Sequence, residues 1–326
     1  MHRRNSVKFA ITTLLSLLVF SANAQDANSY PSKPIRIIVN FPPGGTVDVM
    51  TRGVAQKLTE KWGQPVVVDN RPGAGGNIGA QAVASAEPDG YTLLATPPGP
   101  MTINQYLYKD MRFDPAKLSS VIMMASVPNA IAARIDFPAN NVKELIAYTK
   151  ANPGKVSFGS QGNGSTSHLT GQMFATMVGS DMMHIPFKGE GPALTEILGG
   201  RVDLFLGNIS AVLKLYQNKQ IKLLGVASPK RSPMANEIPA SQEFGMPDFV
   251  ASAWFAIAAP PGTPAPIVNK LNAAILEALK LPDTQQKMAA LGGEVVGGSP
   301  ADMTTMVIAE RARWKKVIET ANVKLD

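Results

Sequence analysis

An apolar, β-branched run that ends in a proline- and glycine-rich turn constrains this chain more than any other feature. Residues 35–39 are mostly aliphatic, Pro42-Pro43-Gly44-Gly45 follow, and an apolar helical period begins at Val47. This order predicts a buried strand, a tight loop and a helix N-terminus. The first N–H groups of a helix lack internal partners and lie at the positive end of its dipole, so a small anion such as a carboxylate suits the loop. The alternative is an ordinary turn that needs glycine for its geometry alone.

The same order of elements recurs along the chain. Residues 65–69 and 91–95 read as further strands, and residues 77–86 as a helix between them. Later, residues 156–160 predict a strand, 161–167 a loop rich in glycine and hydroxyl groups, and 168–178 a helix. Alternating strands and helices predict an α/β fold with a parallel sheet covered by helices. The later loop offers hydroxyls as well as free amides, which makes it the better cradle for an anion.

The N-terminal segment has the pattern of a secretory signal peptide. Arg3, Arg4 and Lys8 precede an apolar stretch, and Ala22-Asn23-Ala24 supplies small residues for cleavage. The pattern predicts that residues 1–24 are a signal peptide, cleaved near Ala24, and that the mature chain is exported.

Composition argues against several other classes of protein. The chain has no cysteine, which excludes a disulfide framework and a thiolate nucleophile. The formal net charge is +7, but the basic residues are scattered, so no nucleic-acid partner is expected. Gly73 and Gly75 suggest a dinucleotide fingerprint, yet Ile78 stands where the third glycine is needed. We therefore expect no cofactor.

Several motifs, taken in order, resemble one known family. They are Phe41-Pro42-Pro43-Gly44-Gly45-Thr46-Val47-Asp48, Asn70-Arg71-Pro72-Gly73-Ala74-Gly75-Gly76, Gly162-Asn163-Gly164-Ser165 with His168-Leu169, Pro186-Phe187-Lys188-Gly189 and Leu198-Gly199-Gly200-Arg201-Val202-Asp203. The chain resembles the Bug (TctC-like) periplasmic solute-binding proteins of tripartite tricarboxylate transporters. The resemblance implies a two-lobed type II periplasmic-binding-protein (Venus flytrap) fold, a periplasmic location, no catalytic activity and no bound metal. It also implies a small carboxylate ligand, a dicarboxylate or an aromatic carboxylate, and delivery to the transporter's membrane subunits.

The resemblance carries over to four ligand-contacting segments. We expect a monomer that binds the ligand through Phe41, Pro43, Gly44, Gly45, Thr46, Asp48, Thr96, Pro97, Ser160, Gly162, Asn163, Gly164, Ser165, Thr166, His168, Asn208 and Ser210. The sequence departs from the family at two positions, because many relatives carry an acid where Gly207 and Gln172 stand.

The expected lobes divide the chain at two crossings. Lobe 1 is residues 25–126 plus 254–326, and lobe 2 is residues 127–253. The apolar stretch near residues 121–135, interrupted by Pro128, and residues 254–259 are the expected crossing strands.

Two residues have open roles, and one enzyme class remains as the alternative. Asp48 either favours the positive end of its helix or bonds to a ligand or the opposing lobe. His168 either braces the second loop or contacts the ligand. The alternative function is an exported hydrolase of a small carboxylate ester or amide, although Ser165 lies outside a G-x-S-x-G elbow. A purely structural or adhesive role would not need two matched anion-binding loops.

Overall fold

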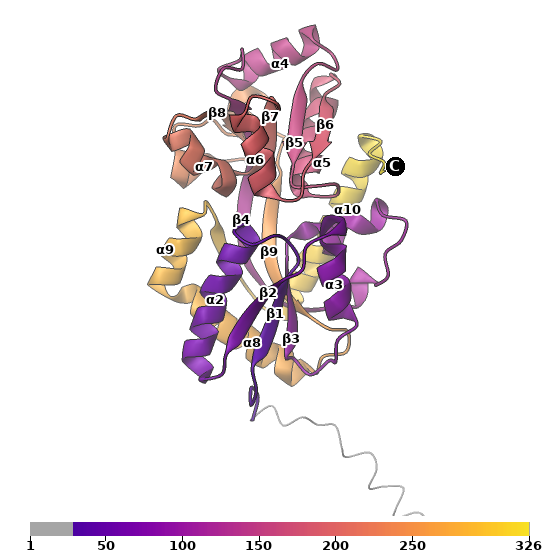
Figure 1. Ribbon diagram of the computed structural model, residues 1–326, viewed down its shortest axis with the longest axis vertical. Helices are drawn as coiled ribbons and strands as arrows, with labels where there is room; N and C mark the ends of the chain where they lie inside the picture. The colour runs from indigo at the N-terminus through magenta and orange to yellow at the C-terminus, as the bar shows by residue number, and fades with distance from the viewer. Residues whose placement is uncertain (1–28, 326) are drawn as a thin grey trace, which may run out of the picture.

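The computed structural model describes residues 29–325, so the predicted signal peptide and its cleavage site lie outside the described residues. Within this range the strands join in the order β2-β1-β3-β9-β4-β7-β5-β6, and β8 and β10 both pair with β4. The molecule is an α/β protein with two lobes arranged along its long axis, as the sequence predicts (Figure 1).

The first lobe is built on the parallel strands that the sequence predicts. Strand β1 lies between β2 and β3, and the antiparallel strands β9, β4 and β10 extend this half of the sheet. The strands are β1 (Ile35–Val39), β2 (Val66–Asn70), β3 (Thr92–Thr96), β9 (Ser252–Ala259) and β10 (Glu294–Gly297), together with the first part of β4 (Ser119–Arg134).

The second lobe repeats this plan around the far end of β4. Strand β5 is parallel to β6 and β7, and β4 pairs antiparallel with β7 and β8 through Asn129 to Arg134. The strands are β5 (Ser157–Ser160), β6 (Met183–Pro186), β7 (Leu204–Asn208) and β8 (Ile221–Val226).

Strand β4 joins the two halves. It is continuous through Pro128, where the sequence suggests a break. Pro128 lies opposite Ser252, the first residue of β9, and β4 pairs with β7 from Asn129 onward. The proline thus falls where β4 changes partners, so its missing N–H costs no bond inside a continuous ladder.

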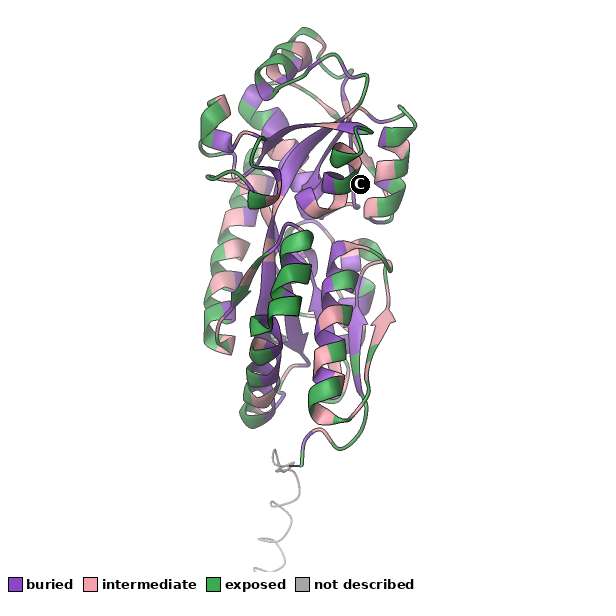
Figure 2. Cartoon of the chain, turned by 90° about the vertical axis from the view of Figure 1, so that its left-hand side faces the viewer, coloured by how far each residue is buried: buried purple, intermediate pink, exposed green. Residues whose placement is uncertain are grey.

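Helices cover both faces of each half because successive strand residues point to opposite sides. Ile37 packs in one apolar cluster with residues of α2 and α8, whereas Ile38 packs in another with residues of α3 and α10. The central strands are accordingly buried, whereas the edge strands β2 and β6 and the outer helix faces are partly or fully exposed (Figure 2). The helices are α2 (Thr46–Trp62), α3 (Asn77–Ala84), α4 (Val142–Ala151), α5 (Thr166–Val178), α6 (Glu190–Leu198), α7 (Ile209–Gln217), α8 (Ala265–Lys280), α9 (Pro282–Ala290) and α10 (Pro300–Thr320).

Short helical turns complete the connections. They are η1 (Ala74–Gly76), η2 (Gly99–Ile103), η3 (Asn104–Tyr106), η4 (Pro115–Lys117), η5 (Pro233–Ala235) and η6 (Ser241–Phe244).

The C-terminal helix α10 contacts both lobes. Met303 and Val307 pack with strand residues of the first lobe, whereas Trp314 and Ile318 pack with Phe174 of the second. The residue boundaries predicted for the lobes therefore stay a proposal. Among the helices of residues 29–325, none combines the length and apolar character needed to cross a membrane.

Candidate functional site

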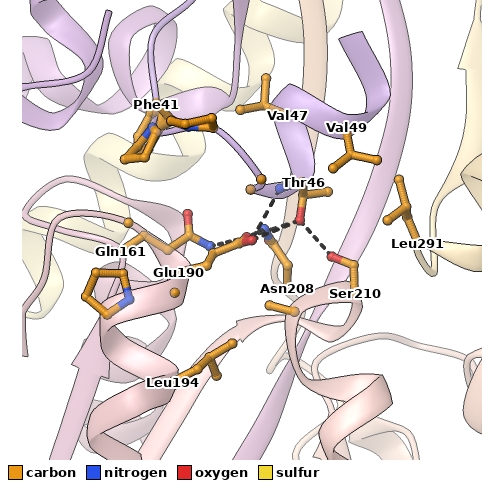
Figure 3. A pocket seen from close by; sticks show the side chains of 18 of the residues that line it. Phe41, Thr46, Val47, Val49, Gln161, Glu190, Leu194, Asn208, Ser210 and Leu291 are labelled. Carbon is orange, nitrogen blue, oxygen red and sulfur yellow. Dashed lines mark hydrogen bonds between the residues drawn. The ribbon is translucent and has the colours of Figure 1, made fainter. Parts of the chain in front are cut away.

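A cavity of about 700 Å³ lies between the two lobes. The first lobe contributes the loop after β1, the start of α2, Pro97 after β3, Phe255 and Leu291. The second lobe contributes Gln161, Lys188, Gly189 and Asn208, together with residues along the length of α6 and α7, from Glu190 to Leu198 and from Ser210 to Asn218. Figure 3 shows polar side chains at the centre of this cavity and apolar ones around them.

Three helices begin at this cavity, and none is capped by a side chain of its own N-cap residue. The N-cap residues are Gly45 for α2, Gly189 for α6 and Asn208 for α7. The first N–H groups of each helix lack intrahelical partners, and each helix places the positive end of its dipole here. The cavity is therefore suited to an anion although its centre holds no lysine or arginine.

The carboxylate of Glu190, the first residue of α6, occupies this centre. Its Oε1 accepts hydrogen bonds from Gln161 Nε2 at 2.8 Å and Asn208 Nδ2 at 2.5 Å. Its Oε2 accepts the backbone N–H of Thr46 at 3.2 Å, and the Thr46 hydroxyl lies 3.1 Å from Oε1. Because the single hydroxyl proton of Thr46 goes to Glu190, Ser210 Oγ donates to Thr46 Oγ1 at 2.9 Å.

The electrostatics of Glu190 follow from these contacts. Burial raises the pKa of the carboxyl, and hydrogen bonds from Asn208 and Thr46 only partly oppose this. All its hydrogen-bond partners are neutral: no ion pair to Glu190 is found within residues 29–325. Lys188 and Lys214 also line the cavity but are exposed residues.

Part of the predicted ligand-binding set lines this cavity. These residues come from the loop after β1, from the end of β3 and from the end of β7: Phe41, Pro43, Gly44, Gly45, Thr46, Pro97, Asn208 and Ser210. The structure brings them together although they come from three separate segments. Their contact with a ligand stays a prediction.

The predicted second loop lies beside the cavity, packed against the first lobe. Only Gln161 of this loop lines the cavity. The Tyr108 hydroxyl donates to the carbonyl of Asn163 at 2.9 Å, and a Cβ at Gly164 would lie 2.5 Å from Asn104 Oδ1. Gly164 also has a φ of +76°, so only glycine suits both the left-handed backbone and the close approach of Asn104 here. The loop thus belongs to the contact surface between the lobes.

Helix α5, behind this loop, has a cap of its own. The Ser165 hydroxyl accepts the N–H of His168 at 3.3 Å and donates to the carbonyl of Gly162 at 2.6 Å. Thr166, the first residue of α5, is buried. A hydroxyl held in a helix cap is not presented as a nucleophile.

His168 lies behind this loop and contacts it through Gly164. Its ring stacks on that of His184 with centroids 3.8 Å apart, and its Nδ1 lies 3.3 Å from the N–H of Gly164. His184 Nε2 in turn lies 2.7 Å from Ser160 Oγ. Burial lowers the pKa of His168 to about 3, helped by neighbouring His184, and lowers that of His184 to about 4. Both rings are therefore neutral at pH 7.

Asp48 and Thr96 hold the cavity loops in place. Asp48 accepts the N–H of Gly44 at 2.9 Å and Asn70 Nδ2 at 2.9 Å, and pairs with Arg52. Burial raises the pKa of Asp48, but these bonds outweigh it, so the pKa is lowered overall. Thr96 accepts a bond from Asn40 Nδ2 at 2.9 Å. Through these contacts Asp48 stabilises the loop after β1, and Thr96 contacts Asn40 at the start of that loop.

The departure at Gly207 has a steric explanation in this chain. A Cβ at Gly207 would lie 2.4 Å from the ring of Phe205 and 3.1 Å from Ser167 Cβ. An acidic side chain therefore cannot enter without movement of Phe205. Gln172, the other departure, lies on α5 outside the cavity lining.

Sequence reasoning missed Glu190 and Gln161. Glu190 follows Gly189 as the first residue of α6, where an acidic residue is common because it favours the helix dipole. Within residues 29–325, no group of His, Cys, Asp and Glu side chains is placed to hold a metal ion.

Comparison with known proteins gives consistent matches. Residues 50–323 match the sequence profile described as the tripartite tricarboxylate transporter family receptor, TctC. Protein BugT of Bordetella pertussis is 37% identical over 323 residues, which are 97% of this chain and 99% of that protein. The structure of R. palustris Rpa4515 with adipate matches with a TM-score of 0.88 and 38% identity, over 91% of this chain and 100% of that chain. MatC from Rhodopseudomonas palustris with bound malate matches with a TM-score of 0.84 and 30% identity, over 89% of this chain and 100% of that chain.

Proposed function

Because this chain belongs to the family of tripartite tricarboxylate transporter receptors, we propose that it captures a small carboxylate between its lobes and delivers it to a tripartite transporter. The resemblance to Bug proteins drawn from the sequence is confirmed. The proposed ligand is a dicarboxylate or an aromatic carboxylate, and the proposed location is the periplasm.

The single observation that carries this proposal is the meeting of three helix N-termini at one cavity. Helices α2, α6 and α7 begin there without side-chain caps, so their amides attract an anion from two opposing lobes. That a carboxylate fits this cradle is supported by Glu190, whose own carboxylate is held there by Thr46, Gln161 and Asn208.

The walls of the cavity favour a ligand with an apolar body. Phe41, Val49, Leu194, Leu198 and Leu291 surround the polar centre. Lys188 and Lys214 also line the cavity, but both are exposed, so solvent screens their charges and they contribute little to binding. Adipate, a dicarboxylate with an apolar chain, is bound by Rpa4515, and malate by MatC, so both are suitable probes.

We propose binding without catalysis. Ser165 is engaged as the cap of α5, and the neutral pair of His168 and His184 lies beneath the loop. The hydrolase alternative needs an exposed nucleophile beside a base, and these contacts do not favour it.

A thermal-shift screen tests the proposal. The purified protein is heated with adipate, malate and benzoate, and separately with the corresponding uncharged amides as matched controls. A ligand at 100 times its Kd adds about 2.7 kcal/mol of stability. We expect at least one carboxylate to raise Tm while its amide does not. Stabilisation by amides alone, or by no carboxylate, would contradict the proposal.

A further inference from the structure

We propose that Glu190 is a tethered competitor for the carboxylate subsite of the cavity, and that it thereby sets the affinity of this protein for carboxylates. This inference rests on the proposed function. In it, the ligand carboxylate takes the donors that Glu190 holds in the structure, and Glu190 must leave before the ligand enters.

The first argument is the identity of the donors. Thr46 N–H, Thr46 hydroxyl, Gln161 Nε2 and Asn208 Nδ2 all point to one carboxylate, and these are neutral donors of the kind that would hold a free carboxylate. Helix α2 has only Gly45 at its N-cap, so Glu190 supplies a cap from the opposite lobe. A ligand carboxylate would supply the same cap.

The second argument is the side chain of Asn208. This residue holds the N-cap position of α7 but makes no capping bond there. Its amide nitrogen donates to Glu190, and its Oδ1 has no hydrogen-bond partner although the residue is 1% exposed. A buried acceptor without a partner costs free energy, so the Asn208 amide is fixed by its bond to Glu190 and not by a network of its own. Its Nδ2 can therefore donate to a ligand carboxylate in place of Glu190.

The third argument is the room that Glu190 has to move. The carboxylate adjoins a cavity of about 700 Å³. A Cβ at Gly191 would meet nothing within 4 Å, whereas a Cβ at Gly189 would lie 3.2 Å from Pro42 Cγ, so the open space beside Glu190 is on the Gly191 side. Rotation about the side-chain torsions of Glu190 therefore moves the carboxylate away from Thr46 without displacing α6.

Electrostatics makes the two occupants mutually exclusive. Two carboxylates in one site repel, and both cannot stay ionised there. Glu190 has no cationic partner among its hydrogen-bonded neighbours to offset a second negative charge. A ligand carboxylate that takes these donors therefore expels the Glu190 side chain toward solvent, where its charge is hydrated.

The apparent affinity for a carboxylate is then the affinity of the free subsite multiplied by the fraction of molecules in which the subsite is free. If Glu190 holds the subsite nine-tenths of the time, carboxylates bind about 10-fold more weakly than the empty subsite allows. Because Glu190 and Thr46 lie on different lobes, the same contact also keeps the ligand-free protein closed.

The test compares Glu190→Ala and Glu190→Gln with Glu196→Ala. Glu196 lies on the same helix α6 and pairs with Arg201, so Glu196→Ala removes the same charge without touching the cavity. Isothermal titration with adipate and malate measures affinity, and small-angle scattering without ligand measures compaction. We expect both Glu190 variants to bind a carboxylate about 10-fold more tightly than wild type and to be less compact without ligand. Glu196→Ala should behave as wild type in both measurements.

The contrary outcomes separate failure of the competitor role from failure of the proposed function. Unchanged or weaker binding by both Glu190 variants, with wild type still binding, would overturn the competitor role and leave the proposed function intact. Absence of carboxylate binding by wild type and variants alike would overturn the proposed function as well. Ligand-free Glu190 variants as compact as wild type would overturn the closing contact.

Discussion

The backbone N–H of Thr46 donates to Oε2 of Glu190 over 3.2 Å, across 144 positions of the chain. This bond joins the first turn of α2 in one lobe to the first residue of α6 in the other. It shows that a single carboxylate is enough to connect the lobes. A ligand carboxylate in the same place would be shared in the same way, and shared binding of this kind is what drives hinge closure.

Tyr108→Phe should weaken ligand binding. The variant removes the hydroxyl that donates to the carbonyl of Asn163, a contact between the predicted lobes. One hydrogen bond contributes about 1 kcal/mol, so we expect about a fivefold loss of carboxylate affinity by titration calorimetry. Tyr106→Phe, at a partly exposed neighbour, is the matched control and should bind as wild type. Equal affinities for all three proteins would show that this contact does not stabilise the closed form.

Gly164→Val should prevent closure while leaving each lobe folded. Its side chain would collide with Asn104 Oδ1, which lies 2.5 Å from an ideal Cβ, and its φ is +76°. Gly154→Val is a close control, because Gly154 has a φ of +73° but nothing within 4 Å of an added Cβ. Small-angle scattering in the presence of adipate should show a compact particle for wild type and Gly154→Val and a more extended one for Gly164→Val. A Gly164→Val particle as compact as wild type would mean that the second loop takes no part in closure.

The individual strand–turn–helix units of this fold can be predicted from the sequence. Hydrophobic periodicity and the proline and glycine residues that end strands and helices are local signals. The predicted strand at residues 35–39 matches β1, and the glycine-rich turn after it does open a helix at Thr46. Pro128 misleads, because a proline normally interrupts a strand. Only the tertiary pairing reveals that β4 changes partners at that residue.

The centre of the cavity is harder to predict, because it depends on residues that are distant in sequence. Thr46 and Asn208 are in the predicted set, but Glu190 is not. An acid in the first turn of a helix ordinarily serves that helix, and nothing near residue 190 indicates that it caps α2 instead. The sequence also favours the later glycine-rich loop as the better anion cradle, yet only its Gln161 lines the cavity. Ser165 caps α5 locally, whereas α2 depends on a residue from the opposite lobe.

Neutralising the cavity lysines should have a small effect on binding. Lys188 and Lys214 line the cavity as exposed residues, and the central donors are uncharged. We expect Lys188→Gln to weaken carboxylate binding by less than about 1 kcal/mol, the scale of an exposed ion pair. Titration of adipate into the variant measures this. A loss above roughly 3 kcal/mol, typical of a broken buried ion pair, would mean that the ligand binds Lys188 directly.

The stacked histidines should make stability fall at acidic pH. The pKa of His168 is about 3 in the folded protein, below its ordinary value of 6.5, so the unfolded chain binds more protons between these values. This contribution is fully present above pH 6.5 and is lost as pH falls toward 3. From pH 7 to pH 5 the loss is about 2 kcal/mol for His168. Glu190 acts in the opposite direction, because its pKa is raised.

Urea unfolding of wild type and His168→Asn at both pH values separates these contributions. The variant keeps Glu190 and lacks the titrating ring, so its loss of stability should be smaller than that of wild type. An equal loss in the two proteins would remove His168 from the explanation.

A crystal structure of the protein with the tightest carboxylate from the thermal-shift screen tests most directly whether a ligand carboxylate replaces Glu190 at Thr46. The measurement is the distance from the ligand carboxylate to the backbone nitrogen of Thr46. We predict a direct hydrogen bond of about 3 Å, or a link through one water, with the Glu190 carboxylate displaced from Thr46. A ligand carboxylate bound elsewhere, with Glu190 still bonded to Thr46, would contradict it.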